Sequence, residues 1–99
     1  MPNYASVRHV RMKPGSAKAI ADRVQAEGVA VMRSVVGFRS YHQVYGADDV
    51  VTSLTVYDSE AAAKEGNRAV VAWIKENLAE FVVSPIDANE GLVIVSVVA

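Results

Sequence analysis

Trp73 and Asn77 are the two side chains whose types and spacing could best serve a reaction on an aromatic ligand. Four residues separate them, so on a helix they lie on the same face, one turn apart. An indole ring can stack on a flat ligand, and an amide can hydrogen-bond its phenol or carbonyl oxygen. The alternative is structural: the indole fills space in the core, while the amide satisfies a carbonyl near the helix end, as buried amides commonly do.

Four further side chains could act as acids, bases or anion-stabilising groups if they line a pocket: Arg8, Tyr41, His42 and Tyr57. The alternation of strand residues puts Tyr41 and His42 on opposite faces, but it does not say which face meets the helices. His42 also fits an ordinary surface or interface histidine. Paired with His9 it would make a poor metal site, because no carboxylate cluster accompanies them. We expect no metal.

The elements that must position these residues begin with a strand and a helix. Residues 4–12 are rich in β-forming residues and stop at Pro14-Gly15, a strong turn signal. From Ser16, a candidate N-cap, apolar or small residues recur at helical spacing. This helix should end before Gly37, which can adopt the left-handed conformation common at helix C-termini.

A β-hairpin is predicted next. Residues 38–45 and 50–57 both alternate and are rich in aromatic or β-branched side chains, and turn residues fill positions 46–49 between them. Residues 38–45 present neither a purely apolar nor a purely polar face.

The second helix and the last strand complete the order. Asp58 and Ser59 offer caps for a helix whose apolar face extends to Phe81, and residues 87–91 are predicted to form a loop. Residues 92–98 are almost entirely apolar and branched, which predicts a final strand. The order β-α-β-β-α-β predicts an α+β, ferredoxin-like fold: a four-stranded antiparallel sheet with both helices on one face.

Composition limits the function classes. The 99 residues suffice for one domain, 1–99, and 52% of them are hydrophobic, which excludes intrinsic disorder. A net charge of -1 predicts no nucleic-acid partner. Without cysteine, the chain has no thiolate site and suits a reducing cytoplasm. Because the sequence shows no signal-peptide pattern and no long apolar run, we expect a cytoplasmic protein that does not bind membranes.

The predicted last strand also implies a partner. Both of its faces are apolar, interrupted only by Ser96. Since the sheet face opposite the helices has no cover within one chain, an apolar face there would mark an interaction surface. We therefore expect a homodimer in which the helix-free sheet faces pack together.

Three stretches carry a resemblance to a known family: Lys13-Pro14-Gly15, the strand start Gly37-Phe38-Arg39-Ser40-Tyr41, and Val56-Tyr57-Asp58-Ser59-Glu60-Ala61-Ala62. With these features the whole chain resembles the antibiotic biosynthesis monooxygenase-like domains of the dimeric α+β barrel superfamily. In that family a Trp more often stands at the position of Tyr57.

The resemblance implies either of two activities. Some relatives are cofactor-independent monooxygenases that oxidise polycyclic phenols to quinones, and others degrade haem. Haem degradation needs a histidine ligand on the second helix, which this chain lacks, so we expect no cofactor. In the phenol-oxidising relatives an Asn stands one turn before the Trp. Here Ala69 holds that position, and Asn67 precedes Trp73 by six residues, on a different side of the helix.

Two function classes remain. The first is a cofactor-independent monooxygenase acting on a small aromatic or quinone-like metabolite between the second helix and the sheet. The second is a non-catalytic ligand-binding or stress-associated dimer of the same fold. Gly28 and Gly66 lie on the predicted buried helix faces, where glycine costs about 1 kcal/mol relative to alanine. Either close packing or room for a ligand would explain them, and close packing is the commoner cause.

Overall fold

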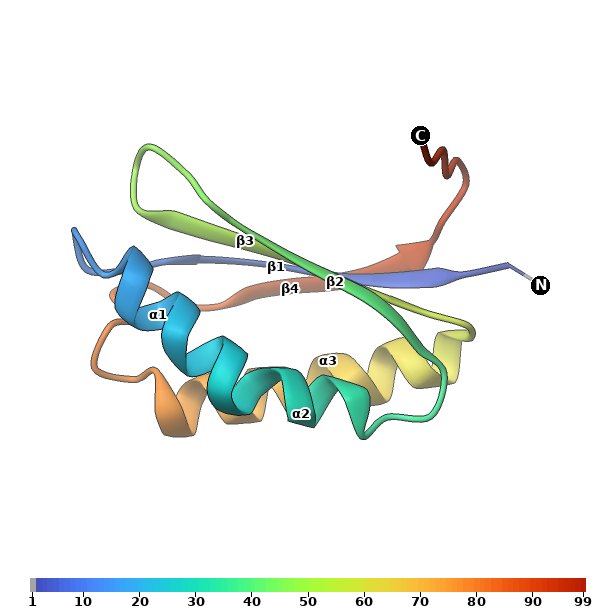
Figure 1. The fold of residues 1–99 in the computed structure, drawn as a ribbon, viewed down its shortest axis with the longest axis horizontal. Coiled ribbons are helices and arrows are strands. Elements are labelled where there is room, and N and C mark those ends of the chain that lie inside the picture. Colours follow the sequence, from blue (N-terminus) through green and yellow to red (C-terminus); the bar gives the residue numbers. More distant parts are fainter. Residues whose placement is uncertain (1) are drawn as a thin grey trace.

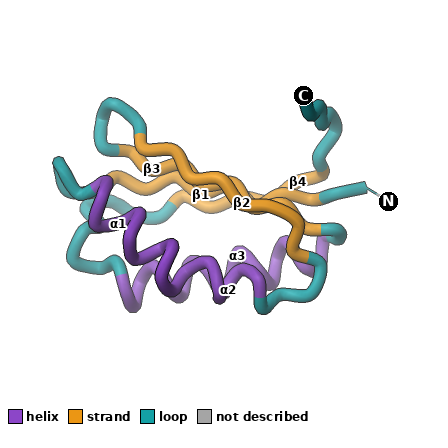
Figure 2. Tube along the Cα trace, viewed as in Figure 1, coloured by secondary structure: helices purple, strands orange, loops and turns teal. Residues whose placement is uncertain are grey.

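A four-stranded antiparallel sheet lies against helices on one of its faces (Figures 1 and 2). The computed structural model describes residues 2–99. The strand order is β2-β3-β1-β4, so the predicted ferredoxin-like fold is confirmed. The elements are β1 (Tyr4–Arg11), α1 (Ala17–Arg23), the π-helical turn η1 (Val24–Gly28), α2 (Val29–Arg33), β2 (Phe38–Tyr45), β3 (Val50–Tyr57), α3 (Glu60–Asn77) and β4 (Asp87–Leu92).

The register of the hairpin decides which side chains face the helices. In β3, burial alternates residue by residue, with Val51, Ser53, Thr55 and Tyr57 buried under the helices. Tyr41 of β2 pairs with Thr55, so it shares that face. From Ser40 onward the same register places the rest of β2: Gln43 and Tyr45 face the helices, whereas Ser40, His42 and Val44 face away. The register shifts between Phe38 and Ser40.

The first helix is interrupted where the sequence predicted one continuous helix. Helical backbone extends from Ala17 to Arg33, but Val24–Gly28 form a π-helical turn within it. π-Helical turns of this kind occur often at functional sites. The Ser16 hydroxyl does not cap the helix; it donates instead to the carbonyl of Lys13 at 2.7 Å.

The predicted C-terminal signal of this helical region is confirmed. Gly37 has φ +100° and joins the region to β2. This is the left-handed backbone that glycine adopts more easily than other residues. Its carbonyl then accepts from the amide of Asp58 at 2.9 Å, which ties the two ends of the hairpin together.

The second helix, α3, begins as predicted and ends earlier. The Ser59 hydroxyl caps it by accepting from the amide of Ala62 at 3.1 Å. The helix stops at Asn77 and does not reach Phe81. The carbonyl of Phe81 instead accepts from the amide of Lys13, because the chain turns back along the edge of β1.

The predicted last strand is wrong in position. Residues 87–91, interpreted as a loop, form β4 with Leu92, whereas residues 93–99 are not in a strand. Because β4 is antiparallel to β1 and Leu92 already pairs with Tyr4, the described residues after Val93 extend past the start of β1, where they find no neighbouring strand. The last backbone bond is from Val93 to the carbonyl of Asn3 at 2.9 Å.

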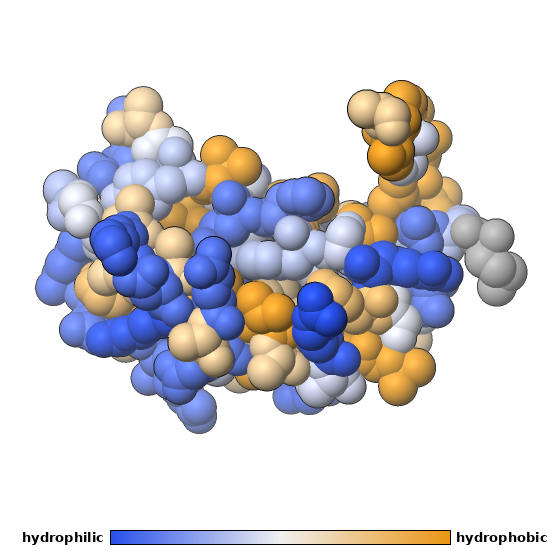
Figure 3. Space-filling view, in the orientation of Figure 1, coloured by the Kyte–Doolittle hydropathy of each residue, from blue (hydrophilic) through white to orange (hydrophobic). Residues whose placement is uncertain are grey.

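This C-terminal tail, residues 93–99, projects from the sheet on the side opposite the helices (Figure 1). Ile94, Val95, Val97 and Val98 are each at least 76% exposed. In the space-filling view, the tail is a concentration of apolar surface at the upper right (Figure 3). The apolar side chains of the tail are therefore not part of the hydrophobic core of this chain.

The core fills the layer between the helices and the sheet. Its buried apolar residues come from β1, β3 and all the helical segments. Across the described residues, the helices include none long and apolar enough to cross a membrane. The buried members of the main cluster are Val10, Met12, Ile20, Val24, Met32, Val51, Val70, Ile74 and Leu78.

Candidate functional site

A narrow pocket opens within this layer, between α3, the first helical region and the sheet. Its free space including the mouth is about 430 Å³, but only about 20 Å³ admits the centre of a water molecule. As it stands, the pocket is a slot with room for about one water. Its walls are mostly apolar, and its polar side chains all come from the sheet: Arg8, Tyr41, Gln43 and Ser53.

Arg8 of β1 is the charged group among the described residues that line the slot. The residue is only 1% exposed, and its guanidinium makes three hydrogen bonds, all to neutral acceptors. Nε donates to the hydroxyl of Ser53 at 3.0 Å, and one terminal nitrogen donates to Thr55 at 2.7 Å. The other donates to the amide oxygen of Asn67 at 3.1 Å. Burial lowers the pKa of Arg8 from its usual value.

Asn67 links this cation to the nearest acid along the hydrogen-bond chain. Its amide oxygen accepts from Arg8, and its amide nitrogen donates to a carboxylate oxygen of Glu90 at 3.1 Å. The two bonds fix which way the amide of Asn67 points. Glu90 lies on β4, on the segment that the sequence predicted to be a loop. Through residues 2–99, no carboxylate lies within ion-pair distance of Arg8.

Tyr41 adds a phenol to the polar end of the slot. Burial raises its pKa above the usual value, and the positive charge of Arg8 and the neighbouring Ser53 hydroxyl oppose that rise. A neutral phenol beside a cation can donate a hydrogen bond to an incoming oxygen. Tyr41, Arg8 and Ser53 therefore form one polar cluster at the sheet floor.

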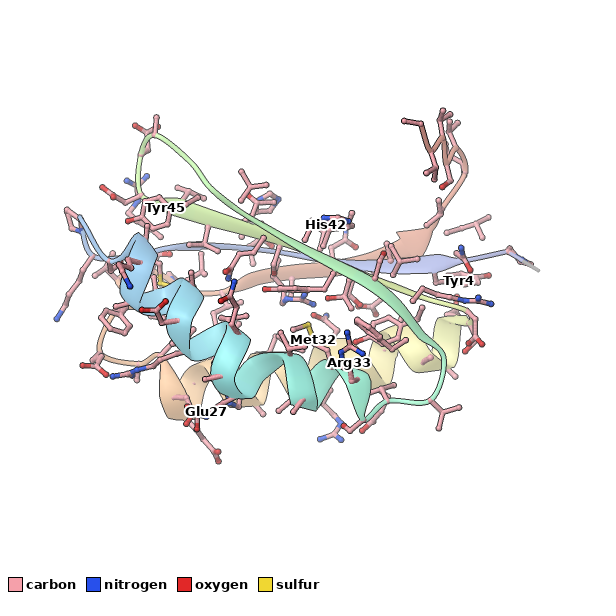
Figure 4. The ribbon with its side chains drawn as sticks, viewed as in Figure 1. Tyr4, Glu27, Met32, Arg33, His42 and Tyr45 are labelled. Atoms are coloured by element: carbon pink, nitrogen blue, oxygen red, sulfur yellow. The ribbon has the colours of Figure 1, made fainter. Side chains whose placement is uncertain are left out.

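Trp73 of α3 forms the opposite, aromatic wall. Its ring packs on the backbone of Gly28 in η1, where an added Cβ would lie 3.2 Å from two ring carbons. Gly28 thus permits close packing, which was the explanation preferred from the sequence. The group that packs against it is the indole of Trp73 and not the sheet. Met32 points from α2 toward the sheet and lines the same slot (Figure 4).

The other predicted site residues lie outside the slot. Asn77 donates its amide to the carbonyl of Trp73 at 3.0 Å, so it satisfies a backbone group near the helix end. His42 is exposed on the helix-free side of the sheet (Figure 4). Tyr57 is fully buried against Gly66, where a Cβ would overlap its hydroxyl. Ligand contact by these residues stays a prediction.

Tyr57 is nonetheless chemically unusual. In the described part of the chain its hydroxyl is buried with no hydrogen-bond partner. Burial raises its pKa, and the charge of Arg8 opposes that rise. Its ring meets Phe38 edge-on with centroids 6.2 Å apart. This packing explains why glycine is needed at position 66 of α3.

Sequence reasoning missed Asn67 and Gln43. From the sequence, Asn67 was considered only for its position around the helix relative to Trp73. In the structure its hydrogen-bond partner is Arg8 on β1. Gln43 follows Tyr41 by two residues and so shares its strand face. Strand alternation does place Gln43 on the face of Tyr41, but nothing in the sequence showed that this face lines a pocket. Nothing local to the sequence connects Asn67 to Arg8, since 59 positions separate them.

No protein-family model matches the chain, and no curated protein matches its sequence. Solved structures do. A protein of unknown function from Nitrosomonas europaea, NE2512, has TM-score 0.78 and 17% identity over 100% of this chain and 96% of its own. A Streptomyces coelicolor monooxygenase, ActVA-Orf6 with nanaomycin D bound, has TM-score 0.76 and 17% identity, covering 99% and 93%.

A third similar structure is a candidate antibiotic biosynthesis monooxygenase from Nitrosomonas europaea, with TM-score 0.73 and 11% identity over 93% of this chain and 90% of its own. At identities this low, the likeness establishes the fold and leaves the activity to be argued from the site. The fold that these comparisons establish for this chain is that of the antibiotic biosynthesis monooxygenase-like proteins.

Proposed function

We propose that this protein is a cofactor-independent monooxygenase that binds a small aromatic or quinone-like metabolite in the slot between Trp73 and the sheet. The observation that carries the proposal is the composition of the slot: an indole wall on one side and a cluster of Arg8, Tyr41 and Ser53 on the other. A flat ring fits the first, and its oxygen fits the second. The same fold in a monooxygenase that holds nanaomycin D supports this assignment.

The proposed reaction needs no redox group from the protein. A phenol and dioxygen give a quinone and water: one oxygen atom becomes the new carbonyl of the ring, and the other leaves as water with two hydrogens of the phenol, one from its hydroxyl and one from the ring carbon that is oxidised. The phenol supplies the electrons. The protein must bind the ring, stabilise negative charge on its oxygen and exclude water, which a cation in an apolar slot can do.

Entry of a ring requires the slot to widen. Trp73 is half-buried at the slot and contacts Gly28 at the π-helical turn, so movement of the indole away from the sheet is the change that would admit a ligand. The alternative function, a dimer of this fold that binds a ligand without catalysis, is favoured by the narrowness of the slot. Binding and turnover must therefore be measured separately.

Trp73 is the single tryptophan of the chain, so its fluorescence reports directly on the slot. Polycyclic phenols should quench it saturably, and Trp73→Leu should weaken their binding. Turnover under ¹⁸O₂ should place one heavy atom in the quinone product. Binding without any oxygenated product would support the non-catalytic alternative. A broad panel of phenols that neither binds nor reacts would refute the monooxygenase proposal.

We also propose that two copies pair through the helix-free sheet face. That face carries half-buried Val7, Leu54 and Val56 on the two central strands and exposed Val44 on the edge strand β2. The apolar tail, residues 93–99, projects on the same side (Figure 1). Two copies related by a twofold axis would cover both surfaces at once, and burial of this much apolar surface favours association.

A further inference from the structure

Among residues 2–99, no carboxylate in the slot that Arg8 lines balances its positive charge. Its side chain is 1% exposed, and its three hydrogen-bond acceptors are neutral oxygens of Ser53, Thr55 and Asn67. Burial of a cation with neutral partners alone is costly, because the bulk water it loses is incompletely replaced. Such a site should bind an anionic ligand more tightly than a neutral one, because the anion supplies the missing negative charge.

The guanidinium still has donors to offer. It carries five N–H groups, and three of them have acceptors among the described residues. Two N–H groups are therefore left for a ligand oxygen. Since hydrogen bonds between an ionised donor and an ionised acceptor are the strong ones, an oxyanion would gain more here than a neutral oxygen.

The guanidinium is also held in place. Ser53 and Thr55 fix it from β3, while Asn67 fixes it from α3 and is itself held by Glu90. A cation fixed in this way cannot turn toward water when the slot is empty. It is preorganised for an anion that enters beside Trp73.

We propose that Arg8 is the anion-recognition residue of this pocket, and that its ligands are flat aromatic molecules that carry an ionised oxygen, either a phenolate or a ring-bound carboxylate. The inference rests on the proposed function and adds its substrate class. For a phenolic substrate, Arg8 favours the phenolate, which gives up electrons to dioxygen more readily than the neutral phenol. Asn67 is a positioning residue that acts through Arg8.

A matched pair of probes tests the charge requirement. 2-Naphthoate and 2-naphthamide share a ring system and differ in charge, and calorimetry at pH 7 measures the affinity of each. The unmodified protein should bind the naphthoate at least about tenfold more tightly, a difference expected of a charge-assisted bond. Arg8→Met keeps much of the side-chain length and should abolish the preference. Arg11→Met is the control, because Arg11 is exposed on the same strand.

A coloured phenol provides a second readout that a merely structural role for Arg8 would not produce. The absorbance of 4-nitro-1-naphthol reports its ionisation, so its titration in the bound state can be followed directly. Binding to the unmodified protein should raise the ratio of naphtholate to naphthol at least about tenfold at a given pH, as a cation within a few ångströms does. Arg8→Met should remove this rise, and Asn67→Ala should reduce it.

The outcomes separate the two proposals. Equal affinity for naphthoate and naphthamide in the unmodified protein, with unshifted ionisation of the bound naphthol, would overturn the role of Arg8 and leave the aromatic pocket standing. Failure of every probe to bind would overturn the proposed function as well. Should Arg8→Met fail to fold, the comparison of charged and neutral probes on the unmodified protein decides the question alone.

Discussion

Gly66→Ala tests the packing that fixes α3 over the sheet. A Cβ at this position would overlap the ring end of Tyr57, which is fully buried. Alanine gains about 1 kcal/mol of helix propensity over glycine. Overpacking of a tight core costs about 3 kcal/mol at the upper end of its usual range. The net expectation is a loss of about 2 kcal/mol of unfolding free energy, or about 8–16 °C in Tm for a domain of this size.

Urea unfolding followed by circular dichroism measures this loss. Gly91→Ala is the matched control, because a Cβ there meets nothing within 4 Å and the backbone needs no left-handed conformation. Gly28→Ala is intermediate, since its Cβ would press on Trp73 at 3.2 Å. The destabilisation should therefore follow the order Gly66, Gly28, Gly91. A Gly66→Ala protein as stable as the unmodified chain would refute the placement of Tyr57 on this glycine.

Two further predictions concern assembly and pH. Val95→Asp or Ile94→Asp should convert the proposed dimer into monomers or aggregates in sedimentation velocity, because a charge would enter its apolar interface; full dimers of both variants would contradict that interface. Burial raises the pKa of Tyr41 in the folded state, so above about pH 10 the unfolded chain releases this proton first and the unfolding free energy falls as pH rises. Tyr41→Phe should flatten that fall in urea unfolding between pH 8.5 and 11, and equal slopes would contradict a buried phenol.

Patterns that repeat within one element were sufficient to predict most of the fold. The alternation in residues 38–45 and 50–57 set the hairpin, and Ser59 and Gly37 marked helix ends that the structure confirms. Each of these signals acts over a few residues, where local sterics and capping dominate. Such signals predict individual helices and strands, but not the contacts between them.

The last strand shows where such signals fail. The polar run at residues 87–91 pairs with β1 through its backbone, which any residue type except proline can do, while the apolar run after it lacks a neighbouring strand. Strand propensity reflects fit to a pleated surface, so it cannot supply a missing partner. In the proposed dimer, a second copy covers residues 93–99.

The candidate site likewise contains residues that the sequence predicted and residues that it did not. Trp73 was identified by its helical spacing, and it does line the slot. The polar cluster depended on contacts between elements far apart in the sequence, such as Arg8 with Asn67, which no spacing rule encodes. The interruption at η1 was also invisible, although it places Gly28 against the indole.

A structure of the protein with a bound aromatic phenol or carboxylate tests the central claim most directly. The account predicts the ring between Trp73 and the sheet, the indole displaced to make room, and the ligand oxygen within hydrogen-bond distance of Arg8. A ligand bound elsewhere on the chain, or one seated in the slot with its oxygen turned away from Arg8, would contradict it.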